Sequence, residues 1–161
     1  MRSIYLGIGT NMGDRARNLS ECKDSVEKTI GSVVSRSHTY ESSSWGFISA
    51  PFYNEVWEVE TEVSPRELLD KCHDIENRSG RVRDPQGEGY DSRVIDIDIL
   101  AYGDQVVRER GLTIPHKFLH MRNFVLVPWS DIAPDFVVPV HERTVIDLLK
   151  LSEDQGYCQR V

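Results

Sequence analysis

Apolar-rich stretches of strand length occur at four places along the chain, and apolar positions follow helical spacing at two others. These stretches predict strands over residues 4–9, 33–40, 52–61 and 92–103, and residues 52–61 show the alternation of a strand. The helical spacing predicts two helices, each with one side facing the core. The inward residues are Leu19, Cys22, Val26 and Ile30 in the first helix, and Leu68, Leu69, Cys72 and Ile75 in the second. Ser64-Pro65 is a typical start for the second helix, because serine can cap it and proline fits its first turn.

The order of these elements is strand, helix, strand, strand, helix, strand, which predicts a ferredoxin-like βαββαβ core in an α+β domain. In that arrangement an antiparallel sheet carries both helices on one face, so we expect the second face to be left for a site. Beyond the core, the sequence predicts a short hairpin near Gly103-Asp104, a Pro-His turn and a small helix around Val145–Leu149. We expect residues 1–161 to form a single domain, because this length supports one core.

The charge balance is acidic, since 26 Asp and Glu against 19 Lys and Arg give a formal net charge of −7. A chain of this sign is a poor general ligand for nucleic acid or an anionic membrane. No stretch approaches the ~20 apolar residues of a membrane span, and Gly7 and Gly9 come too early for a signal peptide. Cys22, Cys72 and Cys158 form no CxxC pair, and the first two are expected in the core. These features favour a cytoplasmic protein without a nucleic-acid or membrane partner.

Two aspartates interrupt the apolar run SRVIDIDILAYG at residues 92–103. Strand alternation places Ile95, Ile97, Ile99 and Ala101 on the core face, and Asp96 and Asp98 with Val94 and Leu100 on the other. The Cα atoms of the two aspartates should lie about 6.5–7 Å apart, so both carboxylates could hold the same cations. Aspartate is a poor strand former and the two charges repel, so the pair fits either a solvated outer face or a Mg²⁺ site.

Basic side chains lie on both sides of this strand in the sequence. Arg81, Arg83 and Arg93 border the loop before it, and His116, Lys117 and Arg122 follow it. Phosphoryl transfer from a nucleotide requires metals that neutralise phosphate oxygens and arginines that bind the remaining ones. The combination therefore favours a site for a nucleotide and Mg²⁺.

Segments spread over nearly the whole chain are similar to one family. They are YLGIGTNMGD, YESSSWGF, FYNEVWEVET, PRELLDKCHDIENRSGRVR, SRVIDIDILAYGD and LTIPHKFLHMRNFVLVPWSDIAPDF. In this order and spacing they resemble the 6-hydroxymethyl-7,8-dihydropterin pyrophosphokinases of folate biosynthesis. The resemblance implies transfer of pyrophosphate from ATP, as co-substrate, to the hydroxymethyl group of the pterin, with release of AMP. It also implies two Mg²⁺ ions as cofactors.

The resemblance assigns roles to particular residues on the nucleotide side. Asp96 and Asp98 match the residues that hold both metals, and Arg81 and Arg93 match arginines that assist the transfer. Nucleotide binding is implied for Arg83, Thr113, His116 and Arg122, with His73, Glu76, Ile99 and Lys117 as weaker candidates.

A second set of residues matches the pterin pocket. A flat, polar-edged ligand needs stacking walls and amide hydrogen bonds. Phe52 and Phe124 match the walls, Asn54 matches the amide that reads the edge, and Ser42, Ser43 and Trp45 lie on the matching loop. Gly9-Thr10-Asn11 is expected to form a tight turn that shapes the pocket, because no Walker motif follows it.

The sequence departs from the family in two loops. The family commonly has Arg-Trp-Gly-Pro-Arg before the Asp-x-Asp strand, whereas this chain has Glu88-Gly89-Tyr90-Asp91-Ser92-Arg93, which lacks the tryptophan and one arginine. Ser43 and Ser44 replace the usual prolines of the earlier loop, and Phe52 stands where tyrosine is often found. The first change puts loop closure and turnover rate in question, since closure often limits turnover.

Two other interpretations stay open from the residues. One is a different Mg²⁺-dependent phosphoryl or nucleotidyl transferase on a ferredoxin-like fold, for which Phe52, Asn54 and Phe124 would have no reason to share a cavity. The other is a non-catalytic ferredoxin-like ligand-binding module, which the acidic pair and the negative charge disfavour for RNA. The expected partners are ATP and the pterin, for a monomer or weak dimer.

Overall fold

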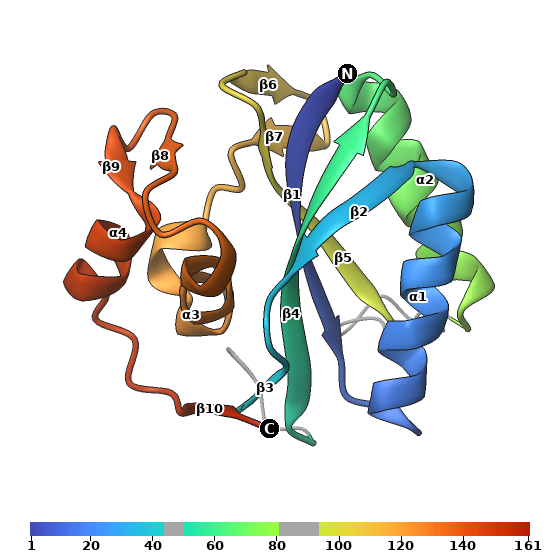
Figure 1. Ribbon diagram of the computed structural model, residues 1–161, viewed down its shortest axis with the longest axis horizontal. Helices are drawn as coiled ribbons and strands as arrows, with labels where there is room; N and C mark the ends of the chain where they lie inside the picture. The colour runs from blue at the N-terminus through green and yellow to red at the C-terminus, as the bar shows by residue number, and fades with distance from the viewer. Residues whose placement is uncertain (44–49, 81–93) are drawn as a thin grey trace.

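A six-stranded antiparallel sheet forms the centre of the protein (Figure 1). The structure is a computed structural model that describes residues 1–43, 50–80 and 94–161. Five strands follow the order β10-β3-β4-β1-β5, and the sixth, β2, pairs with β4. Their bounds are β1 (Arg2–Thr10), β2 (Gly31–Arg36), β3 (Tyr40–Ser42), β4 (Phe52–Thr61), β5 (Asp96–Tyr102) and β10 (Cys158–Arg160).

Two helices, α1 (Arg15–Thr29) and α2 (Pro65–Arg78), lie on one face of this sheet, as expected (Figure 1). Asp14 caps the first and Ser64 the second, each by accepting a backbone N–H bond with its side chain. The predicted helix start at Ser64-Pro65 is therefore confirmed. Among the described residues, no helix is long and apolar enough to cross a membrane.

The core between these helices and the sheet contains the residues that helical spacing turned inward. Leu68 and Cys72 of α2 and Cys22 of α1 are buried there against Leu6 and Trp57 of the sheet. The expectation that Cys22 and Cys72 are small core residues is confirmed, and all the cysteines are free thiols.

The second face of the sheet is partly covered, which corrects the expectation of a face left for a site. There α3 (Asn123–Ile132) and α4 (Val145–Leu151) pack over a second apolar core. Tyr5 of β1 belongs to that core, and its ring centroid lies 5.3 Å from that of Trp129. Helical spacing does not predict α3, because its sequence is apolar on most sides and contains Pro128. The predicted small helix is confirmed by α4.

The chain between β5 and α3 forms a separate hairpin. Its strands β6 (Val107–Glu109) and β7 (Leu112–Ile114) pair across a turn at Arg110-Gly111, where Gly111 has a φ of 75°. The expected hairpin position at Gly103-Asp104 is wrong, because these residues form the turn that ends β5. The short 3-10 helix η1 (Leu119–Met121) then leads into α3, and β8 (Val137–Val138) pairs with β9 (Arg143–Thr144) before α4.

Two of the predicted strands, residues 4–9 and 52–61, are confirmed by β1 and β4. The expected strand at residues 33–40 is instead divided between β2 and β3. The reason lies at Ser37, whose hydroxyl accepts the Val56 backbone N–H at 2.9 Å, so a side chain takes the place of the backbone carbonyl. The strand expected from residue 92 begins at Asp96, while residues 92 and 93 lie outside the described ranges.

An irregularity in β5 changes which face its last residues occupy. Ile99 pairs with Leu6 and Ala101 with Tyr5, so Leu100 is an extra residue on β5. Both Leu100 and Ala101 consequently lie in the second core. The prediction that Ala101 shares the helix-covered face is therefore wrong, since alternation holds only from Ile95 to Leu100. Val94, which alternation places on the face of the aspartates, packs instead against the core under the helices.

Candidate active site

The two aspartates lie on β5 beside a stretch of β1 that has no side chains on their face. Asp98 pairs with Gly7 and Asp96 with Gly9. Both carboxylates are half-buried, whereas Leu100, further along the strand, is buried in the second core. The second face of the sheet is therefore divided into an apolar part under α3 and a part formed by aspartates and glycines.

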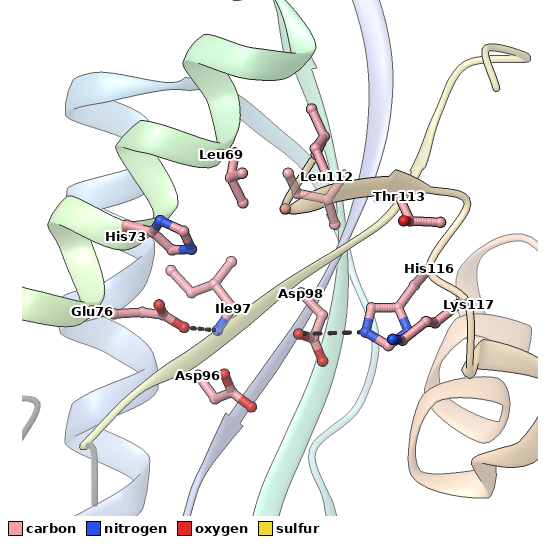
Figure 2. A pocket seen from close by; sticks show the side chains of 12 residues that line it. Leu69, His73, Glu76, Asp96, Ile97, Asp98, Leu112, Thr113, His116 and Lys117 are labelled. Carbon is pink, nitrogen blue, oxygen red and sulfur yellow. Dashed lines mark hydrogen bonds and ion pairs between the residues drawn. The ribbon is translucent and has the colours of Figure 1, made fainter. Parts of the chain in front are cut away.

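A cavity of about 390 Å³ opens beside the aspartates, between α2 and the segment that follows β7 (Figure 2). Figure 2 shows side chains from α2 on one side of β5 and His116 and Lys117 on the other. The predicted nucleotide and metal residues that line it are His73, Glu76, Asp96, Asp98, Ile99, Thr113, His116 and Lys117. Leu69, Ile97, Gly111 and Leu112 complete the lining.

Two nitrogen-bearing side chains face Asp98. His116 Nε2 lies 3.8 Å from Asp98 Oδ1, and Arg122 Nη1 lies 3.8 Å from Asp98 Oδ2. Burial, together with the charge of Arg122, lowers the pKa of His116 to about 4, so the imidazole is neutral at neutral pH. His116 Nδ1 accepts the Phe118 backbone N–H at 3.2 Å, which leaves the ring proton on Nε2. His116 thus presents an N–H donor, and Arg122 a positive charge, next to Asp98.

Glu76 of α2 holds the aspartate-bearing strand in place. Its side chain is only 2% exposed, and its Oε2 accepts the Ile97 backbone N–H at 2.9 Å (Figure 2). Ile97 is the residue between the two aspartates, so this bond fixes the strand at the position where both carboxylates leave it. The expected nucleotide contact of Glu76 stays a prediction, and the structure gives this carboxylate a positioning contact.

Residues predicted for the pterin meet at the ends of β3 and β4. Asn54 Nδ2 donates to Ser42 Oγ at 2.6 Å. Asn54 pairs with Gly9, and a Cβ on Gly9 would lie 3.3 Å from Asn54 Oδ1 and 3.6 Å from Phe52 Cδ1. The amide oxygen of Asn54 therefore faces the space that the glycine leaves.

Phe124 reaches the site from α3. It is half-buried, packs against the second core, and its ring centroid lies 5.6 Å from Arg122 Cζ. Arg122 in turn faces Asp98, so the described residues connect this predicted pterin wall to the metal-binding candidates. Ser43 lies in the described part of the chain after β3, whereas Trp45, Arg81, Arg83 and Arg93 lie outside the described residues.

Gly7 and Arg15 lie near the site and have no predicted role, whereas Asn11 is expected only to shape the pocket. Gly7 pairs with Asp98, and a Cβ on it would meet the Leu100 side chain at 3.4–3.6 Å; the glycine spacing in YLGIG is a signal for it, since glycine inside a strand often marks a close approach. Asn11 Nδ2 donates to the Ala50 carbonyl at 3.1 Å, and Arg15 Nη1 donates to the Pro51 carbonyl at 3.0 Å. These bonds anchor the residues before β4 to the segment from Asn11 to the start of α1. The expected tight turn at Gly9-Thr10-Asn11 is wrong, because β1 continues through Thr10 and Gly9 pairs with strands on both sides.

The chemistry of the aspartate pair fits a hard divalent cation. Mg²⁺ takes one or two carboxylates and completes its six ligands with water and substrate phosphate oxygens. In the described ranges, no three His, Cys, Asp or Glu side chains gather as a metal set. Two carboxylates facing a polar cavity are therefore the donors available here, and they suit a metal that arrives with a phosphate ligand.

A carboxylate pair with adjacent cationic and N–H donors, on an antiparallel sheet covered by helices, is an arrangement that metal-dependent phosphoryl-transfer enzymes use. The model of the 7,8-dihydro-6-hydroxymethylpterin-pyrophosphokinase (HPPK) family matches residues 5–134. The chain belongs to this family.

Relatives agree with this assignment, and a solved structure agrees with the fold. The chain is 41% identical over 140 residues to a 2-amino-4-hydroxy-6-hydroxymethyldihydropteridine pyrophosphokinase of Methylorubrum extorquens, covering 86% of this chain and 87% of that protein. It is 35% identical over 159 residues to the Aquifex aeolicus protein of the same name, covering 98% and 97%. The structure of an HPPK-DHPS protein in complex with substrates matches with a TM-score of 0.74 at 14% identity. That match covers 93% of this chain but 43% of the other, and it supports the fold alone.

Proposed function

We propose that this chain is an ATP-dependent pyrophosphokinase of folate biosynthesis. It transfers pyrophosphate from ATP to the hydroxymethyl group of 6-hydroxymethyl-7,8-dihydropterin and releases AMP. Family membership supports the reaction. The structural observation that carries the proposal is the position of Asp96 and Asp98, which lie between the cavity lined by the predicted nucleotide residues and the sheet face that carries Asn54.

The proposed reaction exchanges one phosphorus–oxygen bond for another. The pterin hydroxyl oxygen bonds to the β-phosphorus of ATP, the bond from that phosphorus to the oxygen shared with the α-phosphate breaks, and AMP leaves with that oxygen. The hydroxyl proton is released. Asp96 and Asp98 would hold two Mg²⁺ ions, which supply charge neutralisation at the phosphate oxygens when bound.

The side chains around the aspartates have complementary proposed roles. Lys117 and Arg122 supply positive charge for the phosphates, and neutral His116 supplies an N–H donor. Thr113, His73 and Ile99 line the space for the rest of the nucleotide. Arg81 and Arg93 are proposed to assist the transfer and Arg83 to bind the nucleotide, on the basis of the resemblance.

The proposed pterin pocket lies over the gap at Gly9. Asn54 Oδ1 faces this gap while Asn54 Nδ2 is held by Ser42, so the oxygen is oriented to accept an N–H of the pterin edge. Phe52 and Phe124 are proposed as stacking walls, and Ser43 and Trp45 as contributors from the adjoining loop. A ligand placed here would lie on the same sheet face as Asp96, across Gly9 from Asn54.

The finer features of the architecture are also proposed. The strand order β5-β1-β4, with β2 and β3 beyond β4, and both α1 and α2 on one face support a ferredoxin-like βαββαβ core. We propose that residues 1–161 form a single domain that acts as a monomer or weak dimer in the cytoplasm. The net charge of −7 supports the absence of a nucleic-acid partner.

The direct test is to incubate the purified protein with Mg²⁺, ATP and the pterin and to measure AMP. Asp96→Ala and Asp98→Ala are expected to lower kcat at least a hundredfold, because each removes a carboxylate that holds the metals. Asp104→Ala is the matched control, since Asp104 is an exposed aspartate in the turn after the same strand and should keep full activity.

The outcomes separate the proposed reaction from its alternatives. Pterin-dependent AMP that disappears in both variants and with EDTA supports the proposal. Production of ADP would mean simple phosphoryl transfer by a different transferase. A folded wild-type protein that binds ATP and the pterin without turnover would contradict the pyrophosphokinase assignment and favour a binding module.

A further inference from the structure

The chain after α4 runs past α3 and ends beside β3 (Figure 1). This segment, residues 152–161, lies outside the part that matches the family model, residues 5–134. It is nevertheless attached to both sides of the proposed pterin pocket. The attachment at one side is Asp154, and at the other it is β10.

Asp154 holds the N-terminus of α3. Its Oδ2 accepts the Asn123 backbone N–H at 2.9 Å, and its backbone carbonyl accepts Asn123 Nδ2 at 3.3 Å. The residue at the usual capping position, Arg122, makes no side-chain capping bond to α3. Asp154 therefore acts as the cap from a distant part of the chain, and its charge is favourable beside the first N–H groups of a helix. The residue after Asn123 is Phe124, the proposed pterin wall.

The same carboxylate also shapes the turn that leads into β10. Asp154 Oδ1 accepts the Gly156 backbone N–H at 2.9 Å. A Cβ on Gly156 would lie 3.0 Å from Ser43 Oγ and 3.2 Å from Asp154 Oδ1, so the turn packs closely against the residue after β3. Two residues later Cys158 pairs with Ser42, whose hydroxyl holds Asn54.

We propose that Asp154 is a positioning residue for the pterin, because it fixes Phe124 of α3 relative to Ser42 and Asn54 of the sheet. One of its oxygens binds the helix that carries the wall, and the other binds the turn that is packed against Ser43. The inference rests on the proposed function for the identity of the ligand. It predicts a selective effect, since Asp154 is not among the described residues that line the cavity on the nucleotide side.

The test compares Asp154→Ala and Asp154→Asn with the control Glu153→Ala, which removes the exposed neighbouring carboxylate. Asp154→Ala is expected to raise KM for the pterin about tenfold, the scale of losing one helix cap, with kcat and KM for ATP changed less than twofold. Asp154→Asn should recover part of the loss, because its amide oxygen can still accept one of the two N–H bonds. Glu153→Ala should match the wild type.

Gly156→Ala provides a second variant if Asp154→Ala does not fold, since it disturbs the same turn and keeps the cap. It should also raise KM for the pterin while leaving KM for ATP unchanged. Equal changes in kcat and in both KM values, or no change in any of them, would overturn the positioning role.

A titration with the pterin, followed by its fluorescence, needs no turnover and separates this inference from the proposed reaction. Wild-type protein that binds the pterin but forms no AMP would defeat the proposed reaction, and a weaker Kd in Asp154→Ala would still support the positioning role. Wild-type protein that binds no pterin would defeat both.

Discussion

Gly9 of β1 stands directly opposite Asp96 of β5, and no side chain at this position separates that aspartate from the next strand. The next strand places Asn54 opposite the same glycine. Since neighbouring strands lie about 4.8 Å apart, the Cα atoms of Asp96 and Asn54 are roughly 10 Å apart across an open stretch of sheet. A small flat ligand held by the amide can therefore reach the metal-binding carboxylates.

Gly9→Ala should weaken pterin binding without loss of the fold. The new Cβ would lie 3.3 Å from Asn54 Oδ1, so the amide must shift by a few tenths of an ångström. We expect KM for the pterin to rise roughly five- to tenfold, equivalent to about 1–1.4 kcal/mol, and KM for ATP to change little. Gly7→Ala is the control on the same strand, because its Cβ makes only ordinary contacts of 3.4–3.6 Å with Leu100. Equal effects of the two variants would contradict the argument.

Asn11→Ala should loosen the start of β4. The variant loses the hydrogen bond from Asn11 Nδ2 to the Ala50 carbonyl, worth about 1 kcal/mol. Steady-state kinetics should show a rise of about fivefold in KM for the pterin, with a smaller effect on KM for ATP. The neighbouring exposed side chain serves as control in Met12→Ala, which should leave both values unchanged. A rise in KM for ATP alone would show that this turn positions residues for the nucleotide and not for the pterin.

Gly31→Ala should destabilise the fold. A Cβ at this position would lie 2.0 Å from the Glu60 carbonyl oxygen, and backbone on both strands must move to accept it. We expect the free energy of unfolding to fall by about 2–3 kcal/mol, measured by urea denaturation. Ser32→Ala, at the adjacent exposed position of β2, should change it by less than about 0.5 kcal/mol. A wild-type midpoint for Gly31→Ala would show that β2 and β4 are farther apart than described.

Glu55→Gln should reduce stability through a buried network. The Glu55 carboxylate, 3% exposed, accepts two bonds from Arg36, at 2.9 and 3.2 Å. It also accepts hydrogen bonds from Thr39 Oγ1 at 2.8 Å and from Trp57 Nε1 at 2.7 Å. In the Gln variant one carboxylate oxygen is replaced by an NH₂ group, which cannot accept hydrogen bonds from these donors. We therefore expect the free energy of unfolding to fall by about 2–4 kcal/mol.

The control for the buried network is Glu60→Gln, on the same strand and exposed, which should have little effect. Activity per folded molecule should stay at the wild-type level in Glu55→Gln, because Glu55 lines no part of the described cavity. A large drop in kcat with unchanged stability would reverse this assignment.

The predictable parts of the fold are those whose residues repeat with a clear period. The apolar spacing of Leu68 and Ile75 and the cap at Ser64 give α2 directly, alternation gives β4, and a short apolar run before a Gly/Asn/Asp loop gives β1. Features that depend on tertiary contacts are not visible in this way. The Ser37 hydroxyl that divides the second predicted strand acts through Val56, which is distant in the sequence.

The same distinction applies to the site. Asp96 and Asp98 are recognisable because two acids in an apolar strand need a compensating partner, and the cavity beside them contains residues expected from the resemblance. The sequence of α3 is apolar on most sides and shows no amphipathic stripe, so the sequence does not predict that a helix covers part of the second face. Asp154 is separated from Asn123 by 31 residues, and no local pattern indicates their contact.

The pairing of β10 with β3 also has a consequence for the order in which the parts of the site assemble during synthesis. Ribosomal synthesis releases the N-terminal strands and helices first, and domains begin to fold as they emerge. The described residues that line the nucleotide cavity have all been added by residue 117, whereas Ser42 gains its partner on β10 only when Cys158 has been added. A nascent chain can therefore assemble its nucleotide side first, while the pterin side is completed only after Asp154 and Cys158 have been added.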